Sequence, residues 1–159
     1  MEKEKITLSG VPETLLVPND RVRDIPASVF DYGWMDGVAD RDHALIIAEG
    51  FLMYVTAEEV QDLFSTIAGK FTHTTLLLEL MTQWMVDHQK LHDTTQLTQT
   101  VFQWGVEKTE DFTRLCPQFH MTGEYNFTDA MRRFSPVFMT LVSPVMRSKN
   151  NRLGKFEQQ

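Results

Sequence analysis

Two acidic side chains stand where the chain could bind a ligand. Asp31 follows a candidate strand over residues 22–29, and Glu49 follows a second one over residues 44–48. Open parallel sheets bind ligands beyond the carboxyl ends of their strands. A carboxylate there can accept hydrogen bonds from an amine or an adenine amino group, and the ring of Tyr32 can lie against a flat heterocycle. A plainer explanation stays open, in which Asp31 begins a turn and Glu49 lies in a solvated loop.

A strand–helix–strand unit would position Glu49. Residues 44–48 form a short apolar run, which is typical of parallel strands covered on both faces. Thr56 and Glu59 have the spacing of a capping box, and Gly69 predicts a left-handed end to the helix. The expected buried face of that helix is Val60, Leu63, Phe64, Ile67 and Ala68. Because residues 74–81 form a second apolar run, we predict that 44–48 and 74–81 are adjacent parallel strands joined by this helix.

The rest of the chain alternates between the two kinds of element. The patterning predicts helices over residues 82–91, 96–104, 110–115, 128–134 and 137–146, the last strained by Pro144. Strands are predicted over residues 118–127 and, at an edge of the sheet, over 152–156. The first twenty residues are weakly patterned and are interpreted as a lead-in with at most one short helix. The predicted fold class is therefore α/β.

Composition excludes several classes of function. The chain of 159 residues has the length of one domain, and its formal net charge of −7 argues against a nucleic-acid binder, since phosphate contacts need clustered Lys and Arg. A single cysteine, Cys116, excludes an internal disulfide and a zinc site built from cysteines. No apolar run reaches about 18 residues, and no signal-peptide core follows Met1. We expect a soluble, cytoplasmic protein with no nucleic-acid or membrane partner.

Other candidate groups for chemistry are weaker. His88 and His92 are four residues apart, so both could reach one metal ion from a single helix face. Zinc sites need three or four protein ligands, however, and Gln89 stands where the usual motif has a glutamate. Two surface histidines are the simpler interpretation, and we predict no metal site. Cys116 has no paired histidine motif and is expected to be structural; the sequence identifies no catalytic residue.

Three blocks of sequence carry a family resemblance. They are Ser28-Val-Phe-Asp-Tyr-Gly-Trp-Met-Asp36, Ala44-Leu-Ile-Ile-Ala-Glu-Gly-Phe-Leu-Met-Tyr54 and Glu58-Glu-Val-Gln-Asp-Leu-Phe64. Together they resemble the leucine carboxyl methyltransferase-like family, and within it the bacterial tetracenomycin-type polyketide O-methyltransferases. The middle block is the most specific, and Phe102-Gln-Trp-Gly105 also fits this branch. The similarity extends over nearly all of residues 15–157.

The resemblance implies a class I, Rossmann-like methyltransferase that uses S-adenosylmethionine. In that family the aspartate of the first block and its neighbour contact the adenine end of the cofactor, and the matching residues here are Asp31 and Tyr32. The glutamate of the middle block also contributes to the cofactor site and matches Glu49. Tyr54 matches a loop on the substrate side. The implied substrate is a small-molecule carboxylate or phenol, with a protein C-terminal carboxylate as the eukaryotic alternative.

The front of the chain departs from the family. Family members have a first strand that ends in a glycine-rich loop, and a second strand whose terminal aspartate binds the ribose hydroxyls. The eight glycines of this chain never form a Gly-x-Gly cluster, and residues 1–14 contain no such acidic strand end. We therefore expect a divergent lead-in over residues 1–14. Residues 15–159 are then the C-terminal part of a methyltransferase domain, with a partial class I sheet that lacks its first two strands.

Alternative functions stay open at this point. The first is an O-methyltransferase-family chain that is inactive in this truncated form. The second is a non-catalytic remnant that pairs with itself or with a partner, because loss of central strands would leave unpaired sheet edges. An unrelated α/β binder of a small ligand is a third. The expected partners are a small-molecule substrate and either a second copy or a separate N-terminal portion.

Overall fold

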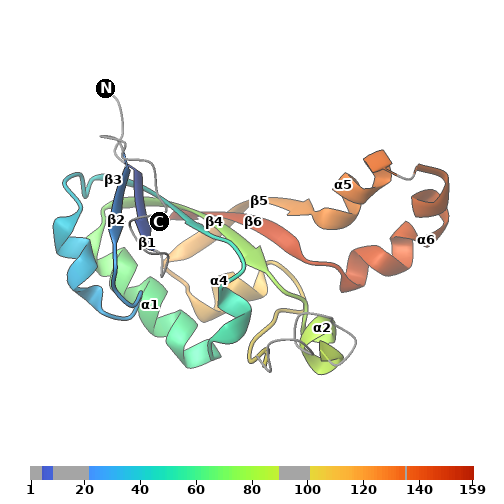
Figure 1. Ribbon diagram of the computed structural model, residues 1–159, viewed down its shortest axis with the longest axis horizontal. Helices are drawn as coiled ribbons and strands as arrows, with labels where there is room; N and C mark the ends of the chain where they lie inside the picture. The colour runs from blue at the N-terminus through green and yellow to red at the C-terminus, as the bar shows by residue number, and fades with distance from the viewer. Residues whose placement is uncertain (1–4, 9–21, 90–100, 135) are drawn as a thin grey trace. The chain divides into compact units, whose positions relative to one another are not determined.

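The computed structural model describes residues 5–8, 22–89, 101–134 and 136–159, and the chain divides into two compact units, Met1–Arg41 and Asp42–Gln159 (Figure 1). In the first unit, β1 (Lys5–Leu8) pairs in parallel with β2 (Val22–Ile25), and the 3-10 helix η2 (Tyr32–Gly37) follows. The lead-in thus contains a strand where the sequence suggested at most a helix. Strand β2 ends before Pro26, which has no N–H to donate, so it is shorter than predicted.

The second unit is built on a four-stranded sheet of order β3-β4-β6-β5. Its strands are β3 (His43–Ala48), β4 (His73–Leu80), β5 (Phe119–Asn126) and β6 (Arg152–Gln158). Strands β3 and β4 are parallel, whereas β6 is antiparallel to both of its neighbours, so β5 runs parallel to β3 and β4. This mixed sheet with its helices confirms the α/β class.

The strand–helix–strand prediction is confirmed. Helix α1 (Ala57–Lys70) connects β3 to β4, and its capping box is present, with Glu59 N–H donating to Thr56 Oγ1 (3.2 Å) and Thr56 N–H donating to Glu59 Oε2 (2.8 Å). Four of the five residues predicted for its inner face are buried: Val60, Leu63, Phe64 and Ile67. The predicted stop at Gly69 is wrong, because the helix continues to Lys70 and is capped by Phe71 in an extended conformation.

Two predictions about the sheet are wrong. The last strand, β6, does not lie at an edge, because β4 and β5 pair with its two sides. Strand β3 is not covered on both faces by the second unit: Leu45 and Ile47 are 61% and 60% exposed. The alternate residues Ile46 and Ala48 are half-buried and in register with the buried Leu76 and Leu78 of β4, so helix α1 covers only that face.

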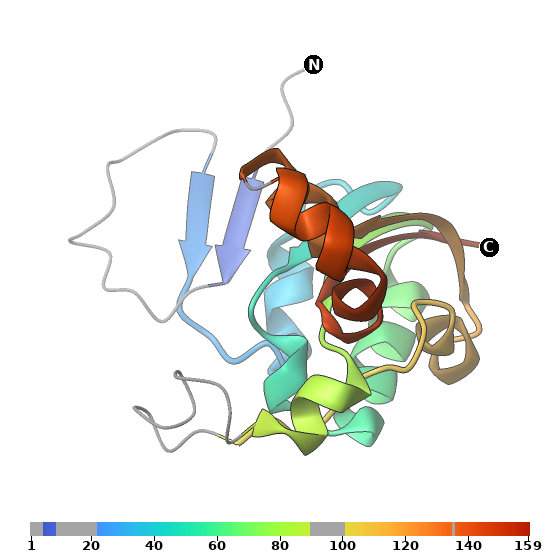
Figure 2. The same ribbon diagram turned by 90° about the vertical axis from the view of Figure 1, so that its right-hand side faces the viewer.

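The remaining helices follow the prediction with shifted ends. They are α2 (Gln83–Asp87), α4 (Asp111–Leu115), α5 (Phe127–Phe134) and α6 (Pro136–Lys149). Helix α6 contains Pro144 without ending there. The helix predicted over 96–104 is absent from residues 101–104, and the rest of that range lies outside the described residues. Helix α6, nearest the viewer in Figure 2, projects beyond the ends of β5 and β6. Among the described residues, no helix is long and apolar enough to cross a membrane.

An aromatic cluster holds α1 and α4 on one face of the sheet. Phe112 of α4 meets Phe64 of α1 edge-on, with 5.1 Å between ring centroids, and lies 4.5 Å from Phe156 of β6. Phe119 of β5 completes the group at 6.2 Å from Phe64. All four side chains are fully buried. This cluster is the centre of the core that supports the strands and their carboxyl ends.

Candidate functional site

The predicted site residues are divided between the two units. Asp31 lies in the first unit and begins a turn: its N–H donates to the Ser28 carbonyl (2.9 Å), and its carbonyl accepts the Trp34 N–H (3.3 Å). The Asp31 side chain is exposed and makes no capping hydrogen bond to η2. Tyr32 is half-buried in the first turn of η2. Because Glu49 and Tyr54 belong to the second unit, a single site formed by all four residues stays a prediction.

Glu49 lies at the carboxyl end of β3, as predicted, and its side chain is exposed. The next residue, Gly50, has a φ of 61°, the left-handed conformation that glycine adopts without a steric penalty. The Gly50 N–H donates to Glu79 Oε2 (2.9 Å), and Asn151 Nδ2 donates to Glu79 Oε1 (2.8 Å). The Glu79 carboxylate, near the end of β4, therefore holds the turn that follows Glu49. It also connects this turn to Asn151, the residue before β6. Sequence reasoning missed Glu79, although an acid within an apolar strand was a visible signal.

We expect Glu79→Ala to loosen this turn. The Gly50 amide should exchange its hydrogen faster, and stability should fall by about 1–3 kcal/mol, because two hydrogen bonds to a charged group are lost. Hydrogen exchange followed by NMR measures the first effect, and chemical denaturation measures the second. Glu79→Gln is the matched control, because the glutamine oxygen can still accept from the Gly50 N–H. The Asn151 Oδ1 is buried and has no partner in the wild type. If the Asn151 amide rotates, this oxygen can accept a hydrogen bond from the glutamine Nε2. Unchanged Gly50 exchange in Glu79→Ala would contradict this role.

Segment 102–106 borders the same end of the sheet. The Gln103 N–H donates to the Met53 carbonyl (2.8 Å) in the loop after β3, and the Val106 N–H donates to the Met81 carbonyl (2.9 Å) after β4. Gln103 Nε2 also donates to the Tyr54 carbonyl (2.6 Å). The Tyr54 ring packs on a small apolar cluster made of Met53, Met81, Val86 and Phe102. Tyr54 therefore lies near the carboxyl ends of β3 and β4, on a wall that the loops after both strands share.

The close approach of this segment requires a glycine at position 105. A Cβ there would lie 2.8 Å from Val86 Cγ2 and 3.0 Å from both the Gln83 nitrogen and the Thr82 carbonyl carbon. We expect Gly105→Ala to destabilise the protein by about 1–3 kcal/mol, because backbone must move to admit the methyl group. Gly69→Ala is the matched control, since space is open there and alanine favours α1 by about 0.5–1 kcal/mol. Equal unfolding midpoints for wild type and Gly105→Ala would refute the clash.

The alternative chemical groups gain no support. His88 stacks on Trp84, with 4.5 Å between centroids, and its Nδ1 lies 2.9 Å from the Trp84 carbonyl oxygen, while His92 lies outside the described residues. In the described part of the chain, no three His, Cys, Asp or Glu side chains could together hold a metal ion. Cys116 is buried, and desolvation raises the pKa of its thiol to about 12. It therefore stays protonated and unreactive at neutral pH.

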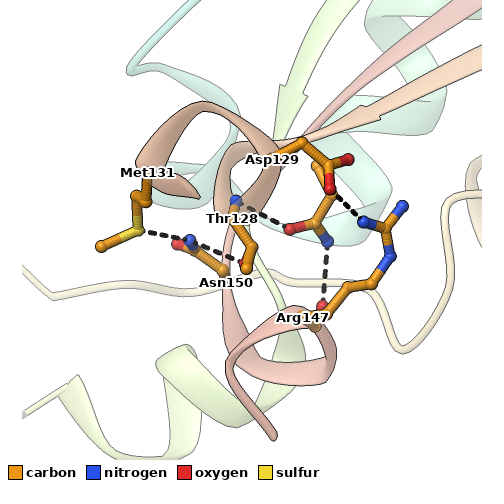
Figure 3. Close-up of polar contacts among 6 residues, drawn as sticks. Thr128, Asp129, Met131, Arg147 and Asn150 are labelled. Atoms are coloured by element: carbon orange, nitrogen blue, oxygen red, sulfur yellow. Dashed lines mark hydrogen bonds and ion pairs between the residues drawn. The ribbon is translucent and has the colours of Figure 1, made fainter. Parts of the chain in front are cut away.

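A polar network at the base of α5 and α6 has a structural role (Figure 3). Arg147 Nη1 pairs with Asp129 Oδ1, and Asn126 Nδ2 donates to the Arg147 carbonyl (2.9 Å). The Thr128 N–H donates to Asn126 Oδ1 (3.0 Å), and Asn150 Nδ2 donates to Thr128 Oγ1 (3.2 Å). These groups bind one another, so the network joins the start of α5 to the end of α6. Sequence reasoning did not identify it, because its members come from positions with no recognisable spacing.

The geometry thus gives one candidate site, at the carboxyl ends of β3 and β4. Glu49 is exposed there, Glu79 holds the turn that follows it, and Tyr54 lies on the adjoining wall. Comparison with known proteins identified no relative of this chain: no family model matches it, and no curated protein matches it.

Proposed function

We propose that this chain is the C-terminal part of an S-adenosylmethionine-dependent O-methyltransferase that acts on a small-molecule carboxylate or phenol. The observation that carries the proposal is the position of Glu49, exposed beyond the carboxyl end of a parallel strand, where open α/β sheets bind ligands. The parallel pairing of β3 with β4 through helix α1 supports it as well, because the resemblance implies a Rossmann-like α/β sheet built from such units.

The residues present fit part of the cofactor. S-adenosylmethionine supplies an activated methyl group on a sulfonium, together with an adenine amino group and ribose hydroxyls that donate hydrogen bonds. Exposed carboxylates are suitable acceptors, and the proposal gives this role to Asp31 and Glu49. Tyr32 would lie against the adenine, and Tyr54 would border the substrate. The chain offers no glycine-rich loop for the rest of the cofactor.

The reaction asks little of the side chains. A substrate carboxylate is ionised at pH 7, so it would need no general base to accept the activated methyl group that the cofactor would supply. A phenol would react as its phenolate. The rate then depends mainly on how well the two reactants are positioned. The loops that carry Glu49 and Tyr54 would supply this positioning, and a carboxylate substrate would need no acid–base pair.

Titration with S-adenosylmethionine, followed by NMR, tests the proposal. With the N-terminal portion of a methyltransferase of the resembled family supplied in trans or as a fusion, we expect shifts at Glu49, Gly50 and Tyr32. In that complex, Asp31→Ala and Glu49→Ala should each weaken binding about ten- to hundredfold through loss of a charge-assisted hydrogen bond. Glu58→Ala is the matched control, because Glu58 is an exposed carboxylate in the first turn of α1. Shifts that cluster elsewhere, or full affinity in both site variants, would refute the assignment.

A non-catalytic interaction module is the second candidate. The specific observation in its favour is the exposed pair Leu45 and Ile47 on β3, the end strand of the sheet. A protein of this kind would give no shifts with millimolar S-adenosylmethionine even when that N-terminal portion is supplied, yet it would still associate. The same titration therefore separates the two candidates.

A further inference from the structure

Among the strands that the structure describes, β3 has a partner on one side only. β3 is the end strand of the sheet, and β4 is its partner among the strands that the structure describes. Natural edge strands are commonly protected by lysine, proline, an inward charge or a bulge. The sequence of β3, His-Ala-Leu-Ile-Ile-Ala, contains neither Lys nor Pro, and its pairing with β4 runs without a register shift. An exposed edge of this kind is a template for β-pairing.

We propose that β3 pairs antiparallel with β3 of a second copy of this chain, about a two-fold axis that passes through Ile46. Directly opposite residues then stand at equal distances on either side of Ile46. Leu45 faces the partner's Ile47, and His43 faces the partner's Glu49. His43, Leu45 and Ile47 are exposed on the face of β3 that α1 does not cover, and Glu49, directly after the strand, is exposed as well. The pairing would join two four-stranded sheets into one continuous sheet.

The self-complementarity of the strand favours a second copy over another partner. Reversal of β3 onto itself brings the two exposed aliphatic side chains together and sets an imidazole donor opposite a carboxylate at each end. A shift by two residues would instead set His43 against the partner's Ile47, or Leu45 against the partner's Glu49. A shift by one residue would set the exposed face of one copy beside the α1 face of the other. Only the register centred on Ile46 matches both kinds of contact.

The interface would be isologous and small. Each patch meets the identical patch of the other copy, as a two-fold axis requires. Because a pair of six-residue strands is shorter than the contact of a typical permanent dimer, the association should depend on concentration. The proposal rests on the β3 edge, so it stands whether or not the chain binds S-adenosylmethionine.

A charge exchange tests the proposed register by sedimentation equilibrium of the full chain. We expect a monomer–dimer equilibrium in the wild type. His43→Glu should weaken the dimer about tenfold, because it sets glutamates opposite each other at both ends of the interface. The double variant His43→Glu with Glu49→His should restore it, since the same pair returns with its members exchanged. His120→Glu makes the same substitution on β5, the strand at the other end of the sheet, where the opposite residue is Glu157 of β6.

A cross-linking experiment gives a second measure of the same register. In an antiparallel pair, opposite Cα atoms lie about 4.5–5.5 Å apart, within the range of a disulfide. A mixture of Leu45→Cys and Ile47→Cys chains should therefore form cross-linked dimers under mild oxidation, whereas neither variant alone should do so. The native Cys116 is buried and should not contribute.

Several results would overturn the proposal. One is a wild-type chain that stays monomeric up to about millimolar concentration. Another is a dimer that His120→Glu weakens while His43→Glu does not, which would assign the contact to β5. A third is cross-linking of either single cysteine variant as efficient as that of the mixture. Circular dichroism of each variant establishes that a lost dimer reflects the edge and not a lost fold.

Discussion

Replacement of Phe112 by alanine is expected to lower the free energy of unfolding by about 3–5 kcal/mol. The Phe112 ring is fully buried and lies between Phe64 of α1 and Phe156 of β6, with centroid distances of 5.1 and 4.5 Å. Helix α4 has only five residues, so it depends on packing and not on its own hydrogen bonds for stability. Truncation of the ring removes apolar burial, leaves a cavity and detaches this short helix from the sheet.

Chemical denaturation followed by circular dichroism measures this effect. Phe112→Leu should lose less than the alanine variant, because it keeps more of the volume. Val145→Ala is the control for loss of an exposed apolar side chain, and its change should stay within about 0.5 kcal/mol. A loss below about 1 kcal/mol for Phe112→Ala would show that the aromatic cluster is not the centre of the core.

The sequence predicts those parts of the fold that short-range patterns determine. Thr56 and Glu59 are three residues apart, and the buried residues of α1 recur with the helical period, so both the cap and the inner face could be predicted. The parallel pairing of β3 with β4 follows from the helix between them, because such a connection returns the chain in the same direction. These signals lie within a single stretch of the chain.

The place of β6 could not be predicted in the same way. Its exposed face carries Lys155 and Glu157, which gives the strand the polar character of an edge, while Phe156 is buried on the other face. Its central position depends on pairing with Thr75 to Leu80 of β4, far away in the sequence. For β3 the error has another source. The apolar run shows that neither face of β3 carries a charged side chain, but it does not show what covers each face.

In the candidate site too, features set by local sequence could be predicted and those set by distant contacts could not. The exposure of Glu49 at a strand end could be predicted, because it needed only the boundary of β3. The role of Glu79 could not, since its two partners, Gly50 and Asn151, are 29 and 72 residues away in the sequence. The meeting of Asp31 and Tyr32 with Glu49 rests on the family resemblance alone and stays a prediction.

The purified 159-residue chain is expected to transfer no methyl group from S-adenosylmethionine. Its sequence has neither a Gly-x-Gly cluster nor an acidic strand end within residues 1–14. Under the proposed function, the ribose and methionine parts of the cofactor would therefore lack the groups that bind them in the family that the sequence resembles. The loss of three net hydrogen bonds, at about 1 kcal/mol each, lowers affinity roughly a hundredfold or more. Any displacement of the remaining groups by about 1 Å costs about another hundredfold in rate.

Transfer of a radiolabelled methyl group to carboxylate and phenol acceptors measures this directly. The informative comparison adds, in trans or as a fusion, the N-terminal portion of a methyltransferase from the family that the sequence resembles. Cofactor binding should then increase, and Glu49→Ala should abolish most of the gain while Glu58→Ala leaves it intact. This pattern would follow only if the added strands complete a site whose other wall is the carboxyl end of β3. Tight cofactor binding by the chain alone would instead require a site built from other residues, and the proposed roles of Asp31 and Glu49 would fall with it.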